Sequence, residues 1–107
     1  MTSQMIIKEL KCGLSKHFNP DNGFVFIFGS RADGKAKPNS DWDIGVIANN
    51  KISGSDLEKA RESLENIRTL QTFELVDFRK VPDSFKKTAM RKIIPLIGHP
   101  IGGRNNQ

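Results

Sequence analysis

The sequence predicts an α+β fold in which a small mixed β-sheet is flanked by helices. An unbroken apolar run over residues 24–28 is typical of a strand buried on both faces, and apolar residues recur at helical spacing over 3–18 and 56–69. A chain of 107 residues is long enough for one domain with a real core and too short to add a separate substrate domain. We expect this domain to span residues 1–97, followed by a loose tail over 98–107.

The first half of the chain is expected to contain one long helix and two strands. The helical pattern over residues 3–18 is stopped by a run of Asn, Pro, Asp and Gly, after which the strand at 24–28 begins. A short helix then starts at Arg31. The segment 34–40, rich in Lys, Pro and Asn, predicts a loop, and residues 41–48 predict the second strand.

The second half is expected to add a helix, a strand and a last helix. Ser55 and Glu58 have the spacing of a capping box, which predicts the start of the helix over residues 56–69. The run over 73–79 reads as a third strand. Residues 84–94 predict a final helix, disturbed at its end by a proline.

A Gly-Ser turn at the end of the first strand is a candidate phosphate site. Gly29 can turn the chain without a Cβ penalty, so a phosphate can approach the backbone N–H groups of Ser30 and Arg31 closely. The Ser30 hydroxyl and the Arg31 guanidinium offer further donors.

Two carboxylates on the next strand are candidate metal ligands. Asp41 and Asp43 are two residues apart, so they share a face of a strand while Trp42 points the other way. Neighbouring carboxylates repel each other unless a cation lies between them, and Mg²⁺ bound by carboxylates and substrate phosphates is the usual solution. A third carboxylate commonly helps, and Glu74 and Asp77 on the third strand are the candidates.

These residues resemble the minimal nucleotidyltransferases of the DNA polymerase β superfamily. The family signature is a Gly-Ser, about ten residues and then Asp-x-Asp, which this chain spells as Gly29-Ser30 and Asp41-Trp42-Asp43. The match continues through the Gly-Ser-Arg-Ala-x-Gly pattern at 29–34 and the strand at 73–78. The resemblance covers roughly residues 5–97.

The resemblance implies a polymerase β-type fold and a two-metal site. Gly29, Ser30 and Arg31 would hold the β- and γ-phosphates of a nucleoside triphosphate, with ATP preferred. Asp41 and Asp43 would bind two Mg²⁺ ions, and Glu74 would complete the acceptor-side metal and assist deprotonation of the attacking hydroxyl. The family usually has Asp at the third position, so the glutamate is a departure and Asp77 is held in reserve.

The resemblance also implies a partner. Stand-alone domains of this kind commonly act as the antitoxin of a small helical HEPN-type ribonuclease toxin and can attach AMP to a toxin tyrosine. The alternative is a binding module that neutralises its partner by contact alone. Modification of a small molecule fits less well, because the chain has no residues to spare for a second domain.

Composition supports a cytoplasmic protein that does not bind nucleic acid directly. The single cysteine, Cys12, excludes an internal disulfide, and no apolar run is long enough to cross a membrane. The formal charge of +5 is spread along the chain with no aromatic stacking pattern. A Walker A reading of residues 29–36 fails because Ala36 stands where Ser or Thr should bind Mg²⁺.

Overall fold

The fold was described from a computed structural model, which defines residues 2–49 and 52–99. Eight elements follow one another along the chain: α1 (Ser3–Leu14), β1 (Gly23–Phe28), α2 (Ser30–Asp33), β2 (Trp42–Ala48), α3 (Gly54–Glu65), β3 (Phe73–Asp77), α4 (Asp83–Ala89) and β4 (Ile94–Ile97). This order confirms the predicted α+β class. Most of the expected tail, residues 100–107, lies outside the described residues.

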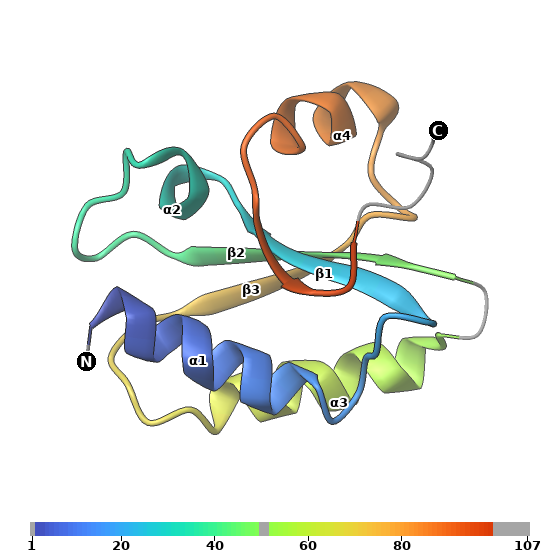
Figure 1. Cartoon of the computed structure of the whole chain (residues 1–107), viewed down its shortest axis with the longest axis horizontal. Helices are drawn as coiled ribbons and strands as arrows, with labels where there is room; N and C mark the ends of the chain where they lie inside the picture. The colour runs from blue at the N-terminus through green and yellow to red at the C-terminus, as the bar shows by residue number, and fades with distance from the viewer. Residues whose placement is uncertain (1, 50–51, 100–107) are drawn as a thin grey trace.

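The four strands form one mixed sheet in the order β3-β2-β1-β4 (Figure 1). β1 pairs antiparallel with both β2 and β4, whereas β2 and β3 are parallel and are connected through α3. Parallel neighbours need a crossover connection, which α3 supplies. β3 lies at one edge of the sheet. None of the helices in the described ranges is long and apolar enough to cross a membrane.

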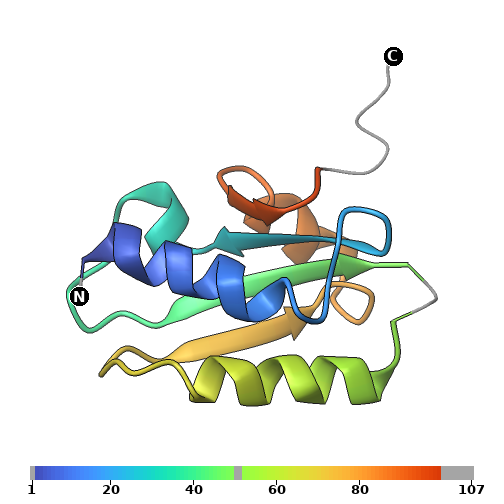
Figure 2. The ribbon, with the colours of Figure 1, turned by 60° about the horizontal axis from the view of Figure 1, so that its bottom comes forward.

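Helices cover both faces of this sheet. α1 and α3 lie side by side on one face and α4 lies on the other, as Figures 1 and 2 show. Along β1, Val25 and Ile27 enter the core beneath α1 and α3. The alternate residues Phe24, Phe26 and Phe28 pack with Phe78 on the α4 side. β1 is therefore buried on both faces, as its apolar run predicts.

The end of the chain differs from the prediction. The final helix stops at Ala89 instead of Ile94, and Ile94–Ile97 form the fourth strand, which the sequence analysis missed. Pro95 cannot supply the N–H that a helix needs, but it is tolerated in a strand at the edge of a sheet. β4 also supplies the second hydrogen-bonded neighbour of β1.

Two helix boundaries also differ from the prediction. α1 ends at Leu14, and the chain continues to Phe18 through turns in which the N–H groups of His17 and Phe18 donate to the Leu14 carbonyl. α3 begins at Gly54, because its capping box is formed by Ser53 and Asp56 rather than by the predicted serine and glutamate two residues later. The helix ends at Glu65, four residues before the predicted end.

Candidate active site

The turn after β1, at Gly29, contacts the Asp43 carboxylate. Gly29 has a φ of +74°, a conformation that favours glycine, and a Cβ built there would lie 2.5 Å from Asp43 Oδ2. The N–H groups of Ala32 and Asp33 donate to the Gly29 carbonyl. No described residue accepts a hydrogen bond from the backbone N–H of Ser30 or Arg31, so the turn presents two free donors next to Asp43.

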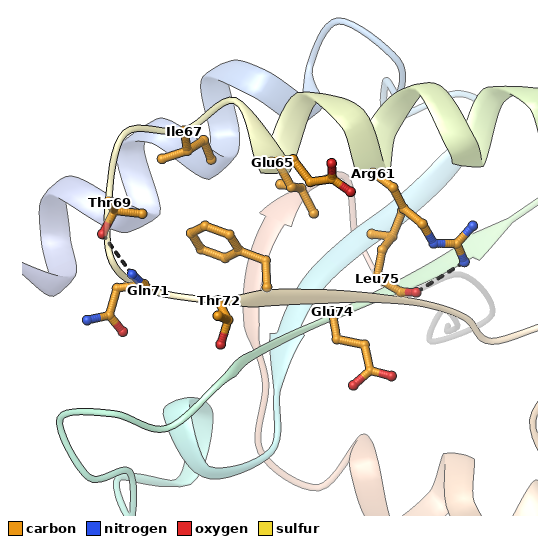
Figure 3. A pocket seen from close by; sticks show the side chains of 10 residues that line it. Arg61, Glu65, Ile67, Thr69, Gln71, Thr72, Glu74 and Leu75 are labelled. Carbon is orange, nitrogen blue, oxygen red and sulfur yellow. Dashed lines mark hydrogen bonds between the residues drawn. The ribbon is translucent and has the colours of Figure 1, made fainter.

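Asp43 lies between this turn and a second carboxylate. In the sheet it pairs with Phe28 of β1 on one side and with Glu74 of β3 on the other. Side chains that pair across parallel strands share a face, and in Figure 3 Thr72 and Glu74 project from one face of β3 while Leu75 projects from the other. Burial, together with the negative charges of Glu74 and Asp41, raises the pKa of the Asp43 carboxyl.

Asp41 stands just before β2 and is exposed. Its Oδ1 accepts a hydrogen bond from the Thr72 hydroxyl, so its carboxylate is directed to the beginning of β3. The charge of Asp41 still reaches Asp43. Over residues 2–49 and 52–99, no three acidic, His or Cys side chains are close enough together to form a complete metal site. The carboxylate oxygens nevertheless match the donors that Mg²⁺ prefers.

Asp77, the reserve candidate, belongs to a different environment. It lies on the face of β3 opposite Glu74, is only 7% exposed and accepts hydrogen bonds from Arg79 Nε at 3.1 Å and Nη2 at 3.2 Å. Burial would raise the pKa of the Asp77 carboxyl, but the hydrogen bonds and charge of Arg79 outweigh burial and lower it. Of the two candidates, only Glu74 lies beside Asp43.

The side chain of Arg31 is turned away from the carboxylates. Its Nη2 donates to the carbonyls of Pro38 at 3.2 Å and Ser40 at 2.8 Å and to Gln71 Oε1 at 2.9 Å. Its guanidinium carbon lies 4.6 Å from the centre of the Trp42 ring. The sequence did not predict that Gln71 contacts Arg31. Its only indication was that Gln71 is a polar residue two positions before the third strand.

The structure contains two open pockets near the site. One, of about 560 Å³, lies between the Gly29 turn and α4, and its walls combine aromatic and cationic side chains: Phe28, Phe85, Lys35, Arg91 and Lys92. The other, of about 490 Å³, lies between α3 and β3, on the face of β3 from which Leu75 projects, whereas the Thr72 and Glu74 side chains at its border point away from α3 (Figure 3). Both volumes are in the range of small-molecule sites.

Comparison with known proteins identifies the family. The family described as "Polymerase beta, Nucleotidyltransferase" matches residues 8–99. The chain belongs to this family, as its Gly-Ser and Asp-x-Asp motifs predict. No curated protein matches the chain.

Solved structures of toxin–antitoxin pairs share the fold of this nucleotidyltransferase domain. A toxin–antitoxin structure with AMP-PNP is 22% identical, with a TM-score of 0.60 over 87% of this chain and 73% of the other. A complex of tri-AMPylated Shewanella oneidensis HEPN toxin with MNT antitoxin is 20% identical, with a TM-score of 0.57 over 92% and 74%. The MntA-HepT toxin–antitoxin is 21% identical, with a TM-score of 0.56 over 91% and 74%.

Proposed function

We propose that this nucleotidyltransferase transfers AMP from ATP to a hydroxyl group on a partner protein, in a Mg²⁺-dependent reaction. The observation that carries the proposal is the juxtaposition of a phosphate-binding turn with two carboxylates. Asp43 touches the Gly29 turn and pairs with Glu74 on the next strand. Negative phosphates can lie between these groups only when a cation offsets the repulsion.

The donor nucleotide is proposed to bind on the α4 side of the turn. The free N–H groups of Ser30 and Arg31 and the Ser30 hydroxyl would hold the β- and γ-phosphates. The pocket beside Gly29 adds the positive charges of Lys35, Arg91 and Lys92, which attract a triphosphate, and the rings of Phe28 and Phe85, which suit a nucleoside.

Asp41, Asp43 and Glu74 are the residues proposed to hold two Mg²⁺ ions. They offer hard oxygen donors. Burial first, and then the negative charges of Glu74 and Asp41, raise the pKa of the Asp43 carboxyl, and a divalent cation would offset that clustering of charge. Bound Mg²⁺ would supply charge stabilisation to the attacking and leaving oxygens.

The acceptor is proposed to approach from the β3 edge of the sheet, where Glu74 is exposed. A hydroxyl oxygen forms a bond to the α-phosphorus while the bond from that phosphorus to the bridging oxygen breaks, so pyrophosphate leaves. Glu74, which is exposed on the edge strand, would take the hydroxyl proton.

We infer a helical HEPN-type toxin as the partner, which makes this chain an antitoxin in the cytoplasm, where ATP is supplied. The support is the similarity in fold to toxin–antitoxin complexes, among them one with AMP-PNP and one with an AMPylated HEPN toxin. The second candidate is a non-catalytic antitoxin that acts by contact, since the same fold similarity also supports an interface between this chain and a toxin.

Transfer is tested with ATP labelled separately at its α- and γ-phosphates, together with Mg²⁺ and a HEPN-type partner. The proposal predicts that the α label, and not the γ label, becomes attached to the partner and that Asp43→Asn abolishes the attachment. Attachment of the γ label would instead indicate a kinase, and attachment of neither would favour the contact module.

A further inference from the structure

We propose that Arg31 is a positioning residue, whose side chain clamps the loop before β2 onto the start of β3 and thereby places Asp41. The inference deepens the proposed function, on which its metal-binding consequence rests. The Gly-Ser motif alone would suggest that the Arg31 side chain binds phosphate, whereas the structure gives it a different set of contacts.

The clamp is a hydrogen-bond network centred on Arg31 Nη2. Nη2 donates to the carbonyls of Pro38 and Ser40 and to Gln71 Oε1, at 3.2, 2.8 and 2.9 Å. Gln71 Oε1 also accepts from Trp42 Nε1 at 3.1 Å, and the guanidinium lies over the Trp42 ring. One end of the arginine thus ties together the loop, the first residue of β2 and the segment that leads into β3.

The network leads directly to a proposed metal ligand. Ser40, whose carbonyl is held at the shortest distance, is bonded through its backbone to Asp41. Gln71 precedes Thr72, whose hydroxyl donates to the Asp41 carboxylate. The two neighbours that fix Asp41, one along the chain and one across the sheet, are therefore both connected to Arg31.

Bidentate binding of a phosphate would need Arg31 Nη2, which is already occupied, so that, among the described residues, only Nη1 of this guanidinium has neither a hydrogen bond nor a buried position. Nη2 has three acceptors, and Nε is buried without an acceptor among the described residues. Trp42, only 2% exposed, anchors the flat face of the group. A lysine would keep the charge but has no planar group to stack on the Trp42 ring.

The test compares Arg31→Lys and Gln71→Leu with Gln71→Glu, which keeps an acceptor for both Arg31 and Trp42. Intrinsic fluorescence reports the clamp without any catalysis, because Trp42 is the only tryptophan and the chain has no tyrosine. Calorimetry gives the affinity for ATP in EDTA and with Mn²⁺. Thermal melting checks that each variant is folded.

Under the clamp, Arg31→Lys and Gln71→Leu both shift Trp42 emission and weaken Mn²⁺-dependent ATP binding about tenfold or more. Gln71→Leu keeps wild-type ATP affinity in EDTA. Gln71→Glu, unlike Gln71→Leu, keeps the wild-type Trp42 emission and the wild-type Mn²⁺ dependence of ATP binding. The inference would be overturned if Gln71→Leu had wild-type Trp42 emission and wild-type Mn²⁺-dependent ATP binding while Arg31→Lys lost ATP affinity in EDTA. That result would assign the Arg31 side chain to phosphate binding. If the wild-type chain bound no ATP, the proposed function would fail, while the emission of the folded variants would still decide the clamp.

Discussion

At the scale of single residues, the site depends on Gly29, which the Asp43 carboxylate contacts. Gly29→Ala would place a methyl group 2.5 Å from Asp43 Oδ2 at a φ of +74°, so Asp43 must move. We expect this variant to lose metal-dependent ATP binding, measured by calorimetry. Gly34→Ala is the matched control, because Gly34 also has a positive φ, of +81°, but nothing lies within 4 Å of its added Cβ.

Gly34→Ala should lower the free energy of unfolding by roughly 1 to 2 kcal/mol, the cost of a left-handed backbone for a residue with a Cβ. Gly29→Ala should lower it further, because a ψ of −153° puts Gly29 in a region almost restricted to glycine and the added Cβ meets Asp43. Only Gly29→Ala should also disturb the site. Equal ATP binding by the two variants would show that contact between the turn and Asp43 is irrelevant to function.

Glu74 and Asp77 give a second comparison. Glu74→Gln removes the carboxylate beside Asp43 and is expected to abolish transfer to the partner while ATP binding persists. Asp77→Asn, on the opposite face, should keep transfer in a folded protein. A labelled-ATP assay on both variants measures this, and activity in Glu74→Gln together with inactivity in folded Asp77→Asn would reverse the assignment.

Asp77 also predicts a pH dependence of stability. Arg79 lowers the pKa of the Asp77 carboxyl below its ordinary value of 3.8, so between the lowered pKa and 3.8 the folded chain binds fewer protons than the unfolded chain. The stabilisation is therefore complete above 3.8 and is lost as the pH falls through the folded-state pKa. Asp77→Asn should lower the free energy of unfolding by about 1 to 2 kcal/mol at neutral pH. In acid, urea titrations should give the variant and the wild type the same free energy of unfolding. An equal difference between the two proteins at neutral and at acid pH would contradict this.

The sequence was sufficient to predict the direction of the Trp42 side chain but not that of the Arg31 side chain. Alternation along a strand put Trp42 opposite Asp43, and the structure has Trp42 in the core beneath α1 and α3. A long, flexible side chain is different, because its direction depends on acceptors distant in sequence. Arg31 is held by Gln71, forty residues away, and no local pattern announces that contact.

At the scale of elements, the start of α3 offers a sharp test of capping. Ser53 accepts from Asp56 N–H, and the Asp56 carboxylate accepts from Ser53 N–H. Ser53→Ala should therefore cost about 1 kcal/mol of unfolding free energy in urea titrations. Ser55→Ala, inside the exposed first turn, should change it little. A larger loss in Ser55→Ala would restore the boundary that the sequence first suggested.

The missed strand shows why element type near a proline was hard to predict. The apolar residues from Ile93 to Ile97 continue the helical pattern of α4, and nothing local requires a strand. β4 forms because β1, buried on both faces, still has a hydrogen-bonding edge to satisfy. That requirement comes from tertiary structure, which overrides the local pattern.

At the scale of the whole molecule, the fold supplies half of a reaction site. The described residues form a pocket beside Gly29, which is the proposed donor site, and the carboxylates of Asp43 and Glu74 lie on neighbouring strands near the exposed edge of β3. An acceptor must be held within about 3 to 3.5 Å of the α-phosphorus and in line with the leaving group. We therefore expect the isolated chain to turn over ATP hardly at all.

AMP transfer is tested most directly by the intact mass of a purified HEPN-type partner after incubation with this chain, ATP and Mg²⁺. We expect a gain of at least one AMP, dependent on Asp43 and Glu74 and absent when the chain or Mg²⁺ is omitted. Asp77→Asn serves as the folded, active control. A partner that is neutralised in a stable complex while its mass stays unchanged would contradict the enzyme and leave an antitoxin that acts by contact.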